Sequence, residues 1–213
     1  FLNTSQSGDK YAFTYQSTVR AQTESWWLRN HGLTFALDHE LESFSQLGFE
    51  RNLDVTGYTL EYAARAFDVL SLTGSVRYDR NSDFKNATTF RAAGAWQLPY
   101  ALGRMMLVYG TGQKDPLFTE RFGFSPSASF TFVGNPGLRP ERSEGWEVQY
   151  RQEYSPAGLL LEAAWFSEKT EDEINGFFAL ANGDFTAVNL PGTTRRRGVE
   201  VALRATLHRS LLA

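Results

Sequence analysis

The sequence predicts an all-β protein of antiparallel strands, and three observations support this prediction. Apolar and polar residues alternate in several separate runs of about nine residues, the period of a strand with two different faces. The connections between these runs alternate between short and long. Little in the 213 residues suggests a helix.

Composition excludes several classes of protein. A content of 42% hydrophobic and 15% aromatic residues is too high for a disordered chain. No apolar run approaches the roughly 20 residues that a membrane-spanning helix needs. The net charge of −3 comes from 24 acidic and 21 basic residues spread along the chain, so no basic stripe suggests nucleic acid. The absence of cysteine excludes a disulfide scaffold and a thiolate metal site.

The chain opens with "FLNTSQSGDK", which has neither a basic n-region nor an apolar h-region. We therefore expect either that a signal peptide has been cleaved or that the sequence is an internal piece of a longer protein.

Alternation is clearest in four runs, which are Leu70–Tyr78, Phe90–Leu98, Trp146–Arg151 and Val199–Leu207. In a soluble sheet the apolar face is the core, whereas in a membrane barrel it faces lipid and the polar face lines a wet lumen. The polar faces of the predicted strands carry Arg77, Arg91, Glu147, Arg151, Glu162, Glu200 and Arg204. Such a set suits a lumen and an external surface equally well, so periodicity alone leaves both interpretations open.

The connections sort by length. Short turns are predicted near Thr23–Asn30, Ala66–Val69, Leu98–Gly103 and Tyr154–Gly158. Longer loops, polar or rich in glycine and proline, are predicted at Glu42–Asn52, Arg80–Ala87, Gln113–Ser143 and Glu171–Asp184. Such sorting is typical of an up-and-down outer-membrane barrel. Trp26, Trp27, Trp96 and Tyr100 lie beside the short turns, where they fit either an interfacial girdle or the core of a sandwich.

Four segments carry a family resemblance: Arg77–Trp96, Met106–Gly123, Gly134–Tyr150 and Arg195–Ala205. In this order and at this spacing they resemble consecutive landmarks of the β-barrel of TonB-dependent outer-membrane receptors. The resemblance implies an antiparallel up-and-down transmembrane β-barrel segment of about nine strands, with short periplasmic turns and long extracellular loops. It also implies that residues 1–213 are a partial barrel from the C-terminal half, with the plug domain absent.

The resemblance implies a function as well. Receptors of this family lie in the outer membrane of Gram-negative bacteria and import a metal chelate, such as a ferric siderophore or haem, or a cobalamin-like ligand. TonB supplies the energy through an N-terminal plug inside a barrel of about 22 strands. This chain shows no plug and no TonB box, and it ends "SLLA" without a terminal aromatic residue. About nine strands cannot close the barrel of this family, so we expect no transport by this piece alone. The alternatives are a passive porin, a barrel enzyme and a soluble β-sandwich binding module.

The predicted loop Gln113–Ser143 holds the candidate ligand-binding residues. Phenylalanines alternate there with cations, a mixture suited to an anionic, partly apolar ligand such as a siderophore. The candidates are Lys114, Phe118, Arg121, Phe122, Phe124 and Arg139. The alternative is that these phenylalanines, with Phe130 and Phe132, pack the loop onto itself or onto the rim.

No catalytic centre, metal site or resident cofactor is expected. His31 and His39 would lie roughly 26 Å apart on a strand, too far to share a metal ion. The run Glu171–Glu173 has oxygen ligands that suit Ca²⁺, although a solvated loop apex is the simpler interpretation. Motifs for acyl transfer and phosphate binding are absent. Arg195–Arg197 lie just beyond the apolar band of their strand on the loop side, so they are expected to pair with lipopolysaccharide phosphates or to snorkel.

Overall fold

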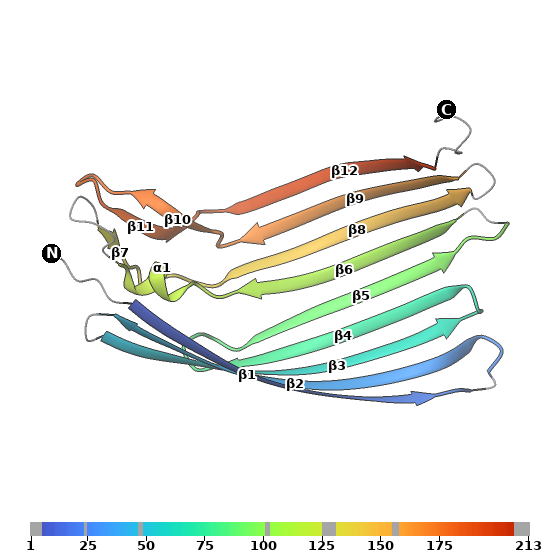
Figure 1. Cartoon of the computed structure of the whole chain (residues 1–213), viewed down its shortest axis with the longest axis horizontal. Helices are drawn as coiled ribbons and strands as arrows, with labels where there is room; N and C mark the ends of the chain where they lie inside the picture. The colour runs from blue at the N-terminus through green and yellow to red at the C-terminus, as the bar shows by residue number, and fades with distance from the viewer. Residues whose placement is uncertain are drawn as a thin grey trace.

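The computed structural model describes residues 6–23, 25–46, 49–100, 103–124, 131–154 and 158–206. Most of them form one antiparallel sheet, which curves like a section of a barrel wall (Figure 1). Its nine strands are β1 (Gln6–Ala21), β2 (Leu28–Gln46), β3 (Phe49–Ala66), β4 (Leu70–Asn81), β5 (Ala87–Gln97), β6 (Arg104–Lys114), β8 (Glu141–Tyr154), β9 (Leu159–Glu171) and β12 (Thr193–Ala205). They lie side by side in chain order, which confirms the predicted all-β, up-and-down topology.

Short turns join the strands at one end of the sheet, and two of the four connections at the other end are much longer (Figure 1). Three residues separate β3 from β4, whereas 26 separate β6 from β8 and 21 separate β9 from β12. Trp26, Trp96 and Tyr100 lie beside the short turns as predicted, and Trp26 and Tyr100 are strongly exposed. The predicted sorting of connections by length therefore holds for the β6–β8 and β9–β12 connections but not for the other two. The predicted loop Arg80–Ala87 is only residues 82–86 between β4 and β5, which is shorter than the six-residue β1–β2 and β5–β6 turns.

The predicted long loop at Glu42–Asn52 is wrong. Strand β2 continues to Gln46 and β3 begins at Phe49, so only residues 47–48 lie between them. The ladder pairs Glu42 with Leu53 through this region. Polar residues suggested a loop, but a strand that rises above the apolar band has water on both faces and tolerates them there. The strands are accordingly longer than nine residues, and β2 has 19.

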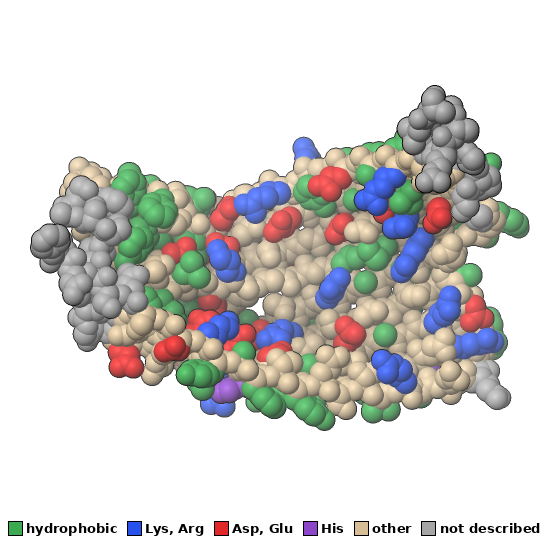
Figure 2. All heavy atoms as spheres, in the orientation of Figure 1, with side chains coloured by type: hydrophobic (Ala, Val, Ile, Leu, Met, Phe, Trp, Pro, Cys, Tyr) green, Lys and Arg blue, Asp and Glu red, His purple; other side chains and the backbone are tan. Residues whose placement is uncertain are grey.

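The two faces of the sheet differ as the alternation predicted. On the convex face, Val199, Val201 and Leu203 of β12 are each about two-thirds exposed. On the concave face, the Arg151 guanidinium pairs with the Glu162 carboxylate of β9 at 3.0 Å. Figure 2 shows acidic and basic side chains scattered over this concave face. Below its loop end, the sheet therefore presents its apolar side chains outward and its charges inward.

Trp146 of β8 belongs to the convex face. Its ring contacts that of Tyr109 on β6, with centroids 4.5 Å apart, and half of the residue is exposed. Glu147 points to the opposite face, where its carboxylate accepts a hydrogen bond from Gln149 at 2.5 Å. Within the described ranges, no second sheet packs on this surface. A β-sandwich requires one, so the sandwich alternative is not supported.

The long connections fold into a compact unit that we call the loop module, comprising residues 118–124, 131–140 and 172–192. It contains helix α1 (Phe118–Phe122) and a small sheet of β7 (Phe132–Val133), β10 (Ile174–Ala179) and β11 (Phe185–Asn189). Strand β11 pairs with β10 antiparallel and with β7 parallel, which joins two connections that are distant in sequence. The predicted loop Glu171–Asp184 is therefore partly strand.

The loop module has its own buried core. Phe132 is 2% exposed and Ala187 is fully buried, and both pack with Leu138. Phe124 stacks on Phe132 with ring centroids 5.2 Å apart. For these two phenylalanines, the alternative that the loop packs onto itself is confirmed, whereas Phe130 lies outside the described residues.

The described residues include no helix with the length and apolar character needed to cross a membrane. Within the described sheet, β1 and β12 each pair with a single neighbour, so both edges are open. Exposed edges of this length need a pairing partner in lipid or in water.

Candidate functional site

A hollow of about 430 Å³ lies on the concave face at the loop end of the sheet, and we call it the mouth hollow. Strands β2, β3 and β4 form one side of it, and the segment that leads into α1 forms the other. Its lining includes Glu40, Glu42, Arg77, Asp79, Asn81, Asp83, Phe84, Ala87, Gln113, Asp115, Phe118 and Arg121. It combines charges with two phenylalanine rings.

Helix α1 brings Phe118 and Arg121 to this hollow. The Glu120 carboxylate accepts a hydrogen bond from the Leu117 N–H at 2.8 Å, which satisfies a free donor at the start of the helix. Gly123 ends the helix with a φ of 75°, a conformation that favours glycine. Phe118 then stacks on Phe44 of β2, with centroids 5.5 Å apart and planes inclined by 10°.

Arg121 fastens α1 to the connection between β4 and β5. Its guanidinium pairs with the Asp83 carboxylate and lies over the rings of Phe84 and Phe122, at 4.6 and 5.0 Å from the centroids. The side chain is 13% exposed. Its Nε atom is buried and has no hydrogen-bond acceptor in the part of the chain that the structure describes. Arg121 is thus a largely buried cation whose Nε donor is unused, at the rim of the hollow.

A second arginine organises the floor of the hollow. The Arg77 guanidinium bridges Asp38 at 2.6 Å and Asp79 at 2.8 Å. A side chain at Gly57 would collide with this guanidinium, so the glycine leaves the space that Arg77 occupies. The cation is therefore fixed across three neighbouring strands.

Carboxylates outnumber cations in the hollow. Lys10 pairs with Glu40 at 2.8 Å and with Glu42 at 2.9 Å along its margin. Asp115 accepts hydrogen bonds from Asn81 at 2.6 Å and from Gln113 at 3.0 Å. Burial nevertheless raises the pKa of Asp115, because removal from water disfavours the charged carboxylate. The hollow is suited to a ligand that presents hydrogen-bond donors and an apolar surface.

Of the six candidate residues, the structure places three at or behind the lining of the mouth hollow and three away from it. Phe118 and Arg121 line the hollow, and Phe122 stacks behind Phe118 with centroids 6.1 Å apart. The other three lie elsewhere: Lys114 pairs with Glu141 at 3.2 Å, Phe124 packs on Phe132 in the core of the loop module, and Arg139 pairs with Asp172 at 2.5 Å. Ligand contact by any of the six stays a prediction.

Sequence reasoning missed the carboxylates of the hollow. Asp38, Glu40 and Glu42 occupy alternate positions of β2 and so project to one face, and Asp79 projects to the same face from β4. The signal was present in the alternation of β2, but part of this stretch was assigned to a loop.

The three carboxylates of Glu171–Glu173 do not point toward one shared position that could hold Ca²⁺, because each pairs with a different basic side chain. Glu171 pairs with Lys169 at 2.6 Å, Asp172 pairs with Arg139, and Glu173 pairs with Arg196. The His31 Nδ1 lies 2.5 Å from the Tyr62 hydroxyl and the His39 Nδ1 lies 3.0 Å from that of Thr56, so both histidines make hydrogen bonds. Across the described ranges, no group of three or more histidine or acidic side chains is placed to hold a metal ion.

A curved up-and-down sheet with apolar residues outside, charges inside and a lined mouth defines a section of an outer-membrane-type β-barrel. The chain belongs to the TonB dependent receptor-like, beta-barrel family, whose model matches residues 2–212. Members of this family are transporters and receptors of the Gram-negative outer membrane, and they are not enzymes.

Solved structures agree with this assignment. The chain is similar to the hemophore receptor HasR of Serratia marcescens, in complex with its hemophore HasA and heme, with a TM-score of 0.77 at 19% identity. It is also similar to the siderophore receptor PirA of Pseudomonas aeruginosa, with a TM-score of 0.77 at 15% identity, and to the RagAB peptide importer, with a TM-score of 0.70 at 14% identity. The alignments cover 94%, 95% and 97% of this chain. At these identities the likeness shows a shared fold.

The chain spans 40% of the length of HasR, 41% of PirA and 28% of the RagAB chain. It therefore corresponds to less than half of a receptor of this kind.

Proposed function

We propose that the chain is part of an outer-membrane receptor that binds and imports a metal chelate, a ferric siderophore or haem, or a cobalamin-like ligand with energy from TonB. We further propose that residues 1–213 form part of the barrel wall, and that TonB acts through a plug contributed by another part of the receptor. The observation that carries this proposal is the mouth hollow, because it lies at the loop end of a family barrel wall. Of the similar structures, HasR is a hemophore receptor in complex with its hemophore and heme, and PirA is a siderophore receptor.

The hollow can contribute contacts of two kinds. The rings of Phe84 and Phe118 offer an apolar surface, and the carboxylates offer hydrogen-bond acceptors. Arg121 adds a cation whose charge is already paired with Asp83. A chelate with both apolar surface and amide or hydroxyl donors matches this lining better than a simple anion does.

Uptake assays in the intact parent receptor test the proposal. Cells that produce the receptor as their only route of import would be given radiolabelled ferric siderophores of the catecholate and hydroxamate classes, haem and cobalamin, with and without TonB. We expect TonB-dependent uptake of one ligand. Uptake of none of them, or uptake that is independent of TonB, would contradict the proposal.

Substitutions in the mouth hollow test whether it binds the imported ligand. Phe118→Ala removes an apolar contact and Arg121→Gln removes the cation, so each should weaken binding of the imported ligand. Arg104→Gln, on β6 at the short-turn end, is the matched control and should bind normally. Equal affinity in all three variants would place the ligand elsewhere.

A further inference from the structure

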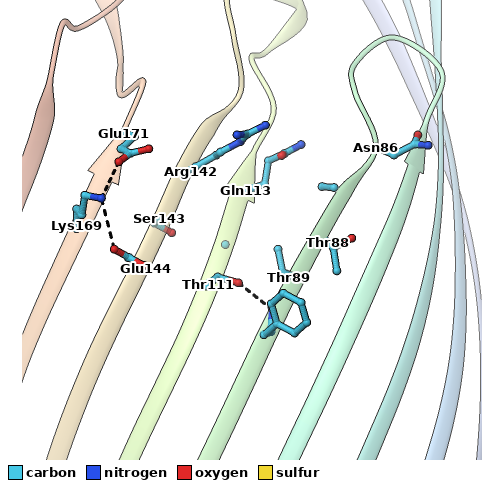
Figure 3. A pocket seen from close by; sticks show the side chains of 13 residues that line it. Asn86, Thr88, Thr89, Thr111, Gln113, Arg142, Ser143, Glu144, Lys169 and Glu171 are labelled. Carbon is cyan, nitrogen blue, oxygen red and sulfur yellow. Dashed lines mark hydrogen bonds and ion pairs between the residues drawn. The ribbon is translucent and has the colours of Figure 1, made fainter.

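The ladder between β5 and β6 is incomplete at the loop end. Pairing stops at Arg91 and Gly110, although β5 begins at Ala87 and β6 extends to Lys114. The Phe90 N–H instead donates to the Thr111 side-chain hydroxyl at 2.8 Å (Figure 3). The two strands therefore diverge and leave an opening in the sheet.

This opening forms a groove of about 380 Å³, which we call the headgroup groove. Figure 3 shows hydroxyl and amide side chains along it, with Arg142 extending from β8 toward Gln113. Lys169 of β9 closes one side and pairs with both Glu144 and Glu171. No ion pair of Arg142 is found within the described ranges, and the side chain is exposed. One cation at this groove is thus free to meet an anion.

The convex face beside this groove is cationic. By their register, Arg195 and Arg197 lie on this face with Lys169 and Ser167 of β9. Both arginines are exposed. Arg196 points to the other face and pairs with Glu173, so only two of the three predicted arginines lie on the surface that would meet lipid. Together with Arg142 and Lys169 they make four cations against the two carboxylates of Glu144 and Glu171.

An apolar hollow of about 390 Å³ borders the groove on the short-turn side, and we call it the chain hollow. Phe90 lines both cavities. The small residues Gly74 and Ala92 pair across β4 and β5 and leave a depression between the larger side chains of Tyr62 and Tyr109. A Cβ atom at Gly74 would meet nothing within 4 Å, so this space is open to an occupant.

We propose that the headgroup groove and the chain hollow together bind one lipopolysaccharide molecule, with a phosphate against Arg142 and an acyl chain over Gly74 and Ala92. The cations lie toward the loops and the apolar depression lies toward the middle of the wall, which is the order of headgroup and chain in the leaflet around the loop ends. Charge complementarity favours a phosphate, and the two cavities adjoin at Phe90, so one molecule can place its phosphate in the groove and its chain in the hollow. This inference rests on the membrane placement in the proposed function, but not on the imported ligand.

Native mass spectrometry of the purified parent receptor, titrated with lipopolysaccharide in detergent, tests the site. Arg142→Gln with Arg195→Gln should lower the affinity about tenfold, as expected for the loss of charge-assisted hydrogen bonds to a phosphate. Gly74→Leu should also lower it, because the new side chain fills the depression. Arg104→Gln and Thr73→Leu, on the concave face, are the matched controls and should bind as the parent does.

Unchanged affinity in the site variants overturns the proposal, and so does equal binding of phosphatidylglycerol, which would show a general requirement for anionic lipid. A receptor that loses lipopolysaccharide but still imports its chelate separates this site from the transport function. A receptor that retains lipopolysaccharide but imports nothing counts against the proposed function alone.

Discussion

The nine-stranded sheet and the loop module bury their apolar residues by opposite rules. In β12 of the sheet, Val201 is 67% exposed and Leu203 is 69% exposed. In the loop module, Phe132 is 2% exposed and Ala187 is fully buried. Water makes exposed apolar side chains costly and buried ones favourable. The comparison teaches that one chain is adapted to two solvents, with lipid around the wall of the barrel and water around its loops.

The largest expected effect concerns the core of the loop module. Phe132→Ala removes the ring that packs on Phe124 and Leu138, so it should lower the local unfolding free energy of the module by about 3–5 kcal/mol. Hydrogen exchange in the parent receptor should then show loss of protection in β7, β10 and β11, with β8 and β9 unchanged. Equal loss of protection in the sheet and the loop module would show that they unfold as one cooperative unit. It would contradict the separation of the two regions.

A pair of neighbours on β12 tests the sheet. Val201→Arg places a cation on the convex face and should destabilise the folded parent by about 2–4 kcal/mol if that face meets lipid. Ala202→Arg places the same charge on the concave face beside Glu162, with which Ala202 pairs across the sheet, and should cost little. Folding into bilayers measured against urea gives both values, and equal destabilisation would contradict the assignment of the faces.

The smallest expected effect is a pH dependence at the base of the loop module. Hydrogen bonds from the Thr194 side chain and from Arg196 hold the pKa of Glu173 below its usual range. A lowered pKa in the folded state stabilises the docked module above the ordinary glutamate pKa, and this contribution is lost as the pH falls through the lowered value. Exchange in β10 should therefore rise as the pH falls below about 4, and Glu173→Gln should abolish this dependence. Exchange in β10 that increases as the pH rises would contradict this role of Glu173.

The sequence was informative about the sheet for a local reason. Alternation with period two depends only on neighbours, so the faces of Val199–Leu203 could be predicted residue by residue. The pairing of β7 with β11 could not, because Val133 and Thr186 are 53 residues apart and neither strand alternates over more than a few positions.

The residues of the candidate site were partly predictable from the sequence. Phe118 and Arg121 could be selected from the mixture of aromatic and basic residues in the loop. Asp83 and Glu40, which share the hollow with them, come from separate strands and connections whose convergence depends on the curvature of the whole sheet.

The most direct test of the central claim is spin labelling of the intact parent receptor in bilayers. Labels at Leu72, Ala92 and Leu203 lie on the convex face, and labels at the adjacent Thr73, Ala93 and Ala202 lie on the concave face. We predict that the first set is accessible to oxygen dissolved in lipid and that the second set is accessible to a water-soluble nickel chelate. The reverse pattern, or the same accessibility at both sets, would contradict a barrel wall with lipid outside and water inside.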